Sequence, residues 1–342
     1  MRIEEFDYTL PQSLIAQYPS PQRDESRLMV LYRSNGKIEH CVFRDIINYL
    51  RPGDLLVMNN TRVLPARLIG KKETGGKFEA LLIPPTNGLN GEYEVLIKGS
   101  GKVKRRIRVQ FDQDLYGEVT EVKDGKGKIR FSYQMEIMDL LQKIGHIPLP
   151  PYIKRGDEPL DKIRYQTVIA ERKGSIAAPT AALHFTQPLL QSIKNGGVNI
   201  VTITLHIGIG TFTPVKSEEV EDHRMETEWI EVSEETAKEI AKTKRLGGKI
   251  IAVGTTTAKA LESFSDLEGR VKPGEKFSSL FIYPPYRFRV IDGLCTNFHL
   301  PKSTLIMLVS AFVDKNFLMK AYEEAIHRKY RFYSYGDAML II

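Results

Sequence analysis

Cysteine is almost absent from this sequence: Cys41 and Cys295 are the only two in 342 residues. Two thiols so far apart in the chain exclude a disulfide framework and a cysteine-based zinc site, and they fit a reducing compartment. The seven histidines form no HExxH pair, and the sequence has neither a P-loop nor a GxSxG nucleophile motif. We therefore expect a protein without a resident metal.

Long apolar runs are also missing. The longest, residues 304–313, is far shorter than the roughly 20 residues that a membrane-spanning helix needs. The first residues, Met1 to Asp7, are polar and acidic and do not resemble a signal peptide. These features predict a cytoplasmic protein with no membrane partner. Its net charge of +7, from 49 basic and 42 acidic residues, is compatible with a polyanionic partner but does not require one.

Hydrophobic periodicity predicts two different kinds of structure along the chain. In residues 1–60 and 146–342, strand-like and helix-like segments alternate, which is typical of a mixed α/β domain with a mainly parallel sheet, either open or barrel-like. Asn35-Gly36 is the signal of a tight hairpin. The predicted strands are 27–32, 38–43, 55–58, 198–205, 249–253 and 278–283, and the predicted helices are 45–50, 189–194, 234–246, 257–264, 304–313 and 317–329.

Residues 61–145 differ, because no helical period interrupts them before residue 134. Short strand-like segments are separated by turn signals such as Gly75-Gly76 and Asn87-Gly88. This pattern predicts a small antiparallel β-barrel domain inserted into the α/β chain, with a helix at 134–144. The expected barrel strands are 62–68, 78–83, 93–97, 107–111, 117–122 and 129–133.

The segment from Gly174 to Thr186 is rich in small residues, nearly uncharged, and contains His184. It has neither the period of an amphipathic helix nor that of a half-buried strand. Small residues let the backbone approach a ligand closely, but they serve equally well where a strand and a helix cross tightly. The residues alone leave both interpretations open.

Three strand-to-loop junctions carry further polar residues. Because ligands bind at the carboxyl ends of strands in open α/β sheets, these junctions should converge. Leu205–Phe212 holds a histidine and a Gly-x-Gly turn, Val253–Lys259 places threonines at a helix start, and Cys295–Thr304 pairs an asparagine with a histidine. A glycine turn and helix capping explain the first two equally well. The third favours a site, since the apolar helix after it needs no such residues.

Basic residues are densest between Lys98 and Arg108, and the segment Arg328–Tyr333 interleaves basic with aromatic side chains. Lysine and arginine can bind phosphates, while tyrosine and phenylalanine can stack on unpaired bases. The alternative is a solvated surface hairpin and a buried aromatic segment. The candidate nucleic-acid contacts are Lys102, Lys104, Arg105, Arg106 and Arg108.

Taken together, these segments resemble one family, the S-adenosylmethionine:tRNA ribosyltransferase-isomerases of queuosine biosynthesis. The family's fold is an α/β domain carrying an inserted β-barrel, in agreement with the prediction above. The matching strings run in the family's order along nearly the whole chain. They are Leu55–Val63, Pro65–Leu68, Pro148–Ile153, Tyr165–Val168, Ala177–Ala181, Leu183–Phe185, His206 with Gly208, Gly210–Phe212, Pro214-Val215, Val253–Thr256, Thr296–Pro301, Tyr330–Phe332 and Gly336–Met339.

The resemblance implies a reaction. Such enzymes transfer and isomerise the ribosyl group of S-adenosylmethionine, their co-substrate, onto 7-aminomethyl-7-deazaguanine at the wobble position of tRNA. Epoxyqueuosine forms, and adenine and methionine are released. A sulfonium acidifies the adjacent ribose carbon, so a positioned histidine can remove a proton there, and no metal is required. The partner is then a tRNA carrying the precursor base, and the expected state is a monomer.

Carried over to this chain, the resemblance also implies site residues. We expect His184, His206 and His299 to supply acid–base groups, with Asn297 and Glu228 orienting them. The residues expected to line the nucleoside pocket are Thr180, Gly208, Gly210, Gly254 and Thr255.

Three positions depart from the family's usual residues: Ala182 replaces a glycine, Glu226 a histidine and Lys259 an arginine. A left-handed backbone at Ala182 would be strained, and Lys259 would lose any bidentate contact. Two alternatives stay open, the first motivated by Glu226 and Lys259 and the second making the basic insert incidental. One is a diverged member that binds tRNA without turnover, and the other is an enzyme that acts on a free nucleoside.

Overall fold

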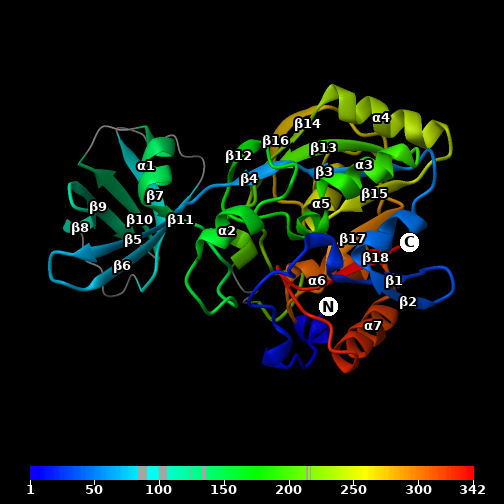
Figure 1. Ribbon diagram of the computed structural model, residues 1–342, viewed down its shortest axis with the longest axis horizontal. Helices are drawn as coiled ribbons and strands as arrows, with labels where there is room; N and C mark the ends of the chain where they lie inside the picture. Colours follow the sequence, from blue (N-terminus) through cyan, green and yellow to red (C-terminus); the bar gives the residue numbers. More distant parts are fainter. Residues whose placement is uncertain (84–90, 100–105, 124, 133–135, 213–214, 216) are drawn as a thin grey trace.

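The computed structural model describes residues 1–342 except 84–90, 100–105, 124, 133–135, 213–214 and 216. Two lobes are visible in Figure 1: a larger one, which we call the body, and a smaller β-barrel joined to it by a narrow neck. The body contains a nine-stranded sheet in the order β16-β14-β13-β3-β15-β17-β18-β1-β2. The predicted mixed α/β fold with an inserted antiparallel barrel is confirmed, and the sheet of the body is the open form of the two expected.

Four parallel strands form the centre of the body sheet: β13 (Asn199–Leu205), β3 (Leu55–Asn59), β15 (Ile250–Val253) and β17 (Gly293–Asn297). The outer strands are antiparallel to their neighbours, except that β18 pairs in parallel with β1. Their bounds are β14 Glu228–Val232, β16 Gly274–Ser278, β18 Ala338–Ile341, β1 Arg27–Leu31 and β2 Ile38–Val42.

The central strand β3 explains how the sheet divides the core. Successive strand residues point to opposite faces, so Leu55 and Val57 enter one apolar cluster while Leu56 and Met58 enter another. The first cluster includes residues of α4 (Glu234–Arg245), α5 (Thr255–Ser263), α6 (Thr304–Phe312) and α7 (Lys315–His327). The second includes residues of α3 (Gln187–Asn195) and of a 3-10 helix, η4 (Phe43–Tyr49). Burial of β3 on both sides is what its unbroken apolar run predicts.

The barrel is an antiparallel sheet that closes because β5 pairs with both β6 and β8. Around it run β5 (Arg67–Lys72), β6 (Lys77–Leu82), β7 (Glu92–Ile97), β10 (Lys126–Phe131), β9 (Leu115–Lys123) and β8 (Ile107–Asp112). Helix α1 (Ile137–Ile144) packs against the core of the barrel. The returning strand β11 (Gly145–His146) then pairs with β5 at the neck. The limits of the insert, residues 61–145, stay a prediction.

Some predicted elements are wrong in extent. The expected strand 62–68 is two strands, because Pro65 has no backbone N–H to donate: β4 (Thr61–Val63) pairs with β12 (Arg172–Ser175) in the body, and β5 starts the barrel. The strand expected at 278–283 ends at Ser278 as β16. The predicted helix 45–50 is the 3-10 helix η4.

The remaining elements are short. They are the helix α2 (Pro159–Arg164) and the 3-10 helices η1 (Ile3–Phe6), η2 (Gln12–Leu14), η3 (Arg23–Glu25), η6 (Thr180–His184) and η7 (Ile209–Phe212). In the described part of the chain, no helix has the length and apolar character needed to cross a membrane.

Candidate active site

The candidate site lies along one edge of the body sheet. Because β13, β3, β15 and β17 are parallel neighbours, their carboxyl ends share that edge. The three polar junctions identified in the sequence follow β13, β15 and β17, and the sheet therefore brings them to the same side of the body. Adjacent strands are about 4.8 Å apart, so the junctions after β13 and β17 are separated by roughly 14 Å.

His206 follows β13 directly. Its Nδ1 lies 2.8 Å from Thr61 Oγ1, and its ring stacks on Trp229 with centroids 4.9 Å apart. The backbone of Gly174 passes so close that a Cβ there would lie 2.5 Å from His206 Nε2. Only glycine fits at Gly174, which shows why the small-residue segment begins there. Burial, with a smaller effect from the Arg172 charge, lowers the pKa of His206 to about 4, so its imidazole is neutral at pH 7.

Glu228 begins the neighbouring strand β14 and is held by two donors. Its Oε1 accepts a hydrogen bond from the Gly208 backbone N–H at 3.2 Å, and its Oε2 lies 2.9 Å from Lys259 Nζ. The side chains of Glu228 and Lys259 are only 10% and 7% exposed. The lysine that replaces the family's arginine thus still neutralises the carboxylate, through a single contact. Gly210 packs against Glu226, whose side chain is exposed.

Gly254 joins β15 to α5 with a φ of 93°, a conformation that favours glycine. Thr255 is the first residue of the helix and is buried. The small-residue segment reaches this junction, since a Cβ on Gly254 would lie 3.8 Å from the Cβ of Ala181. Thr180 opens the 3-10 helix that contains Ala181. The segment therefore both crosses the strand ends tightly and borders the candidate site, so the two interpretations left open by the sequence apply together.

Ala182 is not strained. It lies inside the 3-10 helix η6, and among the described residues the non-glycine positions with positive φ are elsewhere, at Arg106, Lys302, Lys329 and Tyr333. The left-handed backbone considered for Ala182 is therefore not adopted.

His184 uses both of its ring nitrogens inside the protein. Nδ1 lies 2.6 Å from Ser26 Oγ, and Nε2 lies 3.1 Å from Asn297 Nδ2. The Asn297 amide nitrogen also donates to the Tyr333 carbonyl, so it faces acceptors, and His184 Nε2 must accept from it. His184 is then a neutral imidazole with its proton on Nδ1. Burial first, and the Arg331 charge second, lower its pKa to about 3.

His299 is enclosed in a similar way. Its Nε2 lies 2.7 Å from Thr296 Oγ1, its backbone N–H donates to the Tyr322 hydroxyl at 2.9 Å, and its carbonyl accepts from the Tyr8 hydroxyl. Burial lowers its pKa to about 3. Of the predicted site residues, the structure brings His184 into contact with Asn297 and Glu228 into contact with Gly208. Among the described residues, no contact joins the three histidines to one another.

The predicted nucleic-acid contacts are only partly described. Lys102, Lys104 and Arg105 lie outside the described residues. Arg106 and Arg108 are exposed on the barrel, and Arg108 lies over the Tyr116 ring at 4.1 Å. In the second basic segment, Tyr330, Phe332 and Tyr333 are buried, so the idea that these aromatic rings stack on bases is wrong.

Several side chains of the site gave no signal in the sequence. Ser26, Thr61 and Trp229 contact the histidines, but each comes from a segment distant in the chain from the histidine that it touches. Only the sheet order brings them together. Thr61 and Trp229 stand beside strand ends, and that place is the one feature that could have drawn attention to them.

The chain is similar to known proteins along its whole length. The family model described as queuosine biosynthesis protein matches residues 3–341. The S-adenosylmethionine:tRNA ribosyltransferase-isomerases of Sulfurihydrogenibium sp. (strain YO3AOP1) and Halothermothrix orenii are 50% and 53% identical, with 100% of each chain covered. The crystal structure of S-adenosylmethionine tRNA ribosyltransferase from Thermotoga maritima is 39% identical, covers 99% of this chain and 100% of its own, and has a TM-score of 0.57. The chain therefore belongs to the queuosine biosynthesis protein family.

Proposed function

We propose that this chain is an S-adenosylmethionine:tRNA ribosyltransferase-isomerase. It transfers the ribosyl group of S-adenosylmethionine to 7-aminomethyl-7-deazaguanine at the tRNA wobble position and isomerises it, which gives epoxyqueuosine-tRNA with release of adenine and methionine. The observation that carries the proposal is the identity of about half of all residues with full-length relatives of that name. The polar edge at the carboxyl ends of β13, β3, β15 and β17 supports it.

His206 is the best candidate for the catalytic base. Its Nδ1 is fixed by Thr61, and among the described residues Nε2 has no hydrogen-bond partner. Because its pKa is about 4, the ring is unprotonated and can accept a proton from the ribose carbon next to the sulfonium. The same proton can then be returned to adenine as it departs. Methionine leaves with the electron pair of the C–S bond and is neutral at sulfur, while the amine of the precursor base forms the new C–N bond to the ribosyl group and loses one of its own protons.

Glu228 and Lys259 hold the loop that follows His206. The carboxylate fixes the Gly208 N–H, and the ammonium group balances the buried negative charge. We assign Gly208, Gly210, Gly254, Thr255 and Thr180 to the nucleoside pocket because they border the same sheet edge.

His184, His299 and Asn297 are assigned to positioning rather than to proton transfer. Both histidines are buried and already use ring nitrogens in hydrogen bonds with Ser26, Asn297 and Thr296. Asn297 links β17 to His184 and to the segment before β18. This differs from the expectation that all three histidines act as acids or bases.

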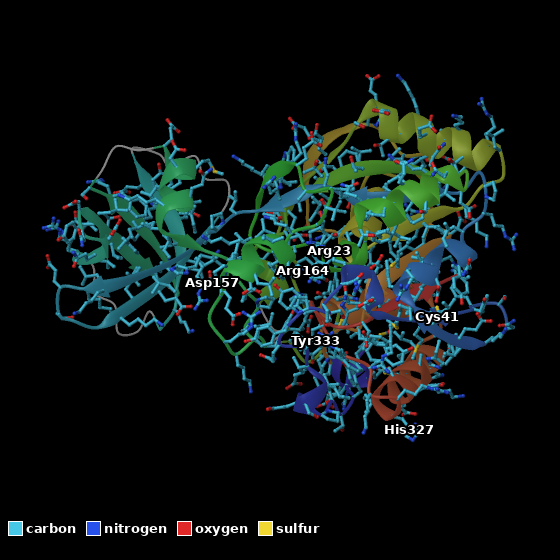
Figure 2. The ribbon with its side chains drawn as sticks, in the orientation of Figure 1. Arg23, Cys41, Asp157, Arg164, His327 and Tyr333 are labelled. Atoms are coloured by element: carbon cyan, nitrogen blue, oxygen red, sulfur yellow. The ribbon has the colours of Figure 1, made fainter. Side chains whose placement is uncertain are left out.

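The test is release of adenine from S-adenosylmethionine, measured with tRNA that carries the precursor base, with tRNA that lacks it, and with the free precursor nucleoside. The proposal predicts adenine only with precursor tRNA. Tight tRNA binding without adenine would favour a binder that has lost turnover, and adenine formed with the free precursor nucleoside would favour an enzyme of free nucleosides. His327→Gln, a change of an exposed histidine far from the site (Figure 2), is the control for folding and handling.

The setting and assembly belong to the same proposal. We place the enzyme in the cytoplasm, where its tRNA substrate is found, and expect it to act as a monomer without a metal. Sedimentation of the enzyme alone and with tRNA would test the monomer, since a dimer would sediment as about twice the 38.9 kDa of one chain.

A further inference from the structure

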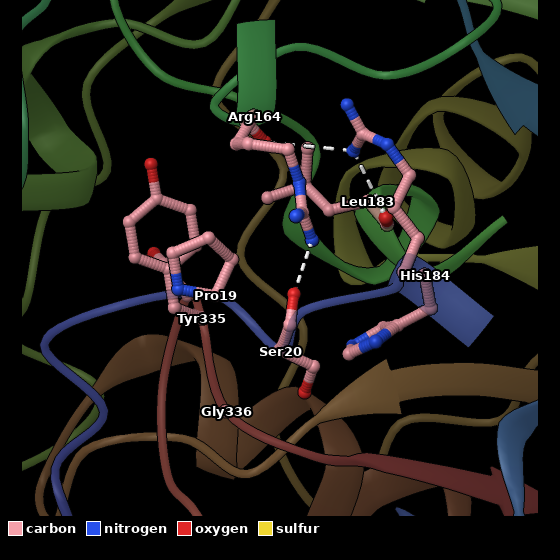
Figure 3. A pocket seen from close by; sticks show the side chains of 9 residues that line it. Pro19, Ser20, Arg164, Leu183, His184, Tyr335 and Gly336 are labelled. Carbon is pink, nitrogen blue, oxygen red and sulfur yellow. Dashed lines mark hydrogen bonds between the residues drawn. The ribbon is translucent and has the colours of Figure 1, made fainter. Parts of the chain in front are cut away.

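Three arginines gather beside a small cavity in the body, whose lining includes neither His206 nor Glu228. The cavity measures about 20 Å³ and is lined by Ser20, Arg23, Arg164 and His184, among others (Figure 3). Arg331 stands next to it, with its Nη1 donating to Ser20 Oγ at 2.8 Å. We call Arg23, Arg164 and Arg331 the arginine cluster.

Among the described residues, the guanidinium groups of the arginine cluster donate to backbone carbonyls and to the Ser20 hydroxyl, and not to carboxylates. Arg23 donates to the carbonyls of Leu183 and Ile163, and Arg164 to those of Pro21 and Ser20. Among the described residues, no carboxylate lies within ion-pair distance of the three guanidinium groups. Asp337 acts on the charge of Arg331, but it is 3.2 Å from Arg27 Nε and is shared with it.

This arrangement leaves positive charge without an equal negative charge. All three side chains are half-buried, and burial lowers the pKa of each of them; for Arg23 it falls to about 10, with the Arg164 charge as the second cause. The Nε of Arg164 is buried without a hydrogen-bond partner in the described structure. Partly buried charges normally have a partner, so an anion is what the cluster lacks.

We propose that the arginine cluster binds a phosphate group of the RNA backbone. Guanidinium groups match the geometry of phosphate oxygens, and a space of about 20 Å³ holds one oxygen atom of a phosphate that remains at the mouth. The cluster donates to the backbone carbonyls of Tyr18 and Ile163. These two residues are exposed, with 48% of the surface of Tyr18 and 69% of that of Ile163 accessible to solvent. Ile163 offers an apolar surface to the adjoining sugar or base, whereas Arg155 lies over the Tyr18 ring at 4.2 Å and the Tyr18 hydroxyl donates to Glu158. The inference rests on the proposed function for the identity of the RNA as tRNA.

The place of the cluster fits an RNA that spans both lobes. Arg23 and Arg164 lie on the side of the body toward the barrel (Figure 2). The barrel itself exposes Arg106 and Arg108. A tRNA in contact with both lobes would place one phosphate at the cluster while the wobble base reaches the sheet edge, to which His184 connects the cavity through Asn297.

The first test is Arg164→Gln, measured by tRNA binding at several salt concentrations. We expect a dissociation constant about 5–20-fold higher and a salt slope reduced by about 1, because one phosphate contact is lost. The KM for S-adenosylmethionine at saturating tRNA should be unchanged. Arg245→Gln, at an exposed arginine that ends α4, is the matched control and should bind tRNA like the parent.

The second test separates an anion site from a structural clamp. Ser20→Glu places a carboxylate at the cavity wall beside Arg331 and Arg164. If the cluster is an anion site, the new carboxylate should raise the melting temperature and weaken tRNA binding. If the arginines only hold the backbone carbonyls, tRNA binding should stay the same. This variant also keeps the proposal testable if Arg164→Gln does not fold.

Two results would overturn the proposal. Unchanged tRNA affinity in both variants would show that the arginines only hold the backbone. A higher KM for S-adenosylmethionine with unchanged tRNA affinity would assign the cluster to the carboxylate of the co-substrate, which has related oxyanion chemistry. The tRNA-affinity result does not depend on turnover, whereas the KM result does. Turnover by the parent enzyme with precursor tRNA tests the proposed function separately.

Discussion

The two ends of the polar sheet edge use the same residue type differently. After β13, His206 is fixed through one ring nitrogen and has no hydrogen-bond partner for the other among the described residues. At β17, His184 is hydrogen-bonded through both nitrogens, and His299 is buried with Nε2 on Thr296. The difference teaches that a histidine in a family motif is not by itself an acid–base group, because its partners decide whether it can exchange a proton.

The largest effect on activity should come from substituting His206, the histidine with a free ring nitrogen among the described residues. His206→Gln keeps a polar side chain but removes the proposed base, and we expect kcat for adenine release to fall by about 10²–10⁴ with a melting temperature near that of the parent. His184→Gln should do the reverse, with a clear loss of stability and a smaller loss of kcat. Parallel measurements of kcat and melting temperature check both variants. Equal losses of kcat at the two positions would contradict the assignment.

The next largest effect should come from Lys259. Lys259→Met leaves the Glu228 carboxylate buried without a counter-charge, and removal of one partner of a buried pair costs about 3–5 kcal/mol in the free energy of unfolding. Urea denaturation followed by fluorescence of the single tryptophan, Trp229, measures it. Lys259→Arg is the control and should remain near the parent. A small loss in Lys259→Met would mean that the pair contributes little.

A third prediction concerns acid stability at the β17 end. The pKa values of His184 and His299 are about 3 in the folded chain and about 6.5 in the unfolded one. Below pH 6.5 the unfolded chain therefore binds more protons, so their contribution to stability is complete above pH 6.5 and declines as the pH falls toward 3. Protonation of the unfolded chain should lower the free energy of unfolding by about 2 kcal/mol per histidine between pH 7 and pH 5.

Urea denaturation of the parent and of His184→Gln at both pH values measures this decline. The variant should lose about 2 kcal/mol less than the parent over the same range. Identical pH dependence in the two proteins would show that His184 is not the group that titrates.

The smallest effect is expected on the barrel. Arg106→Gln and Arg108→Gln each remove one exposed charge, which should weaken tRNA binding only about 2–5-fold and reduce the salt slope by about 1 per residue. Filter binding at several salt concentrations checks this. Unchanged slopes in both variants would remove these two arginines from the RNA surface.

Much of the fold could be predicted from local patterns. The unbroken apolar run of β3 and the Asn35-Gly36 turn between β1 and β2 both appear in the structure. The alternation of turns and short strands predicted the barrel. The divided strand at Pro65 and the parallel pairing of β4 with β12 could not be read in this way, because that pairing joins segments more than a hundred residues apart.

The site was harder to predict for the same reason. The Gly-x-Gly turn and the Asn297 and His299 motif were visible in the sequence. Which of His184 and His206 is proposed as the base depended on their contacts with Ser26, Thr61 and Gly174. These contacts arise only when segments distant in the chain meet. Residue types indicated which groups were present, and the partners decided which of them is available for chemistry.

The neck of the barrel has a consequence for the architecture of the chain. The strand that enters the barrel and the one that leaves it are paired neighbours, with Arg67 opposite His146, and residues opposite each other in an antiparallel pair lie about 5 Å apart. Joining Ala66 to Ile147 through a short turn would therefore bridge a very small gap. The barrel is therefore a separable insert, and a different module with adjacent ends could be grafted in its place without changing the order of the body strands.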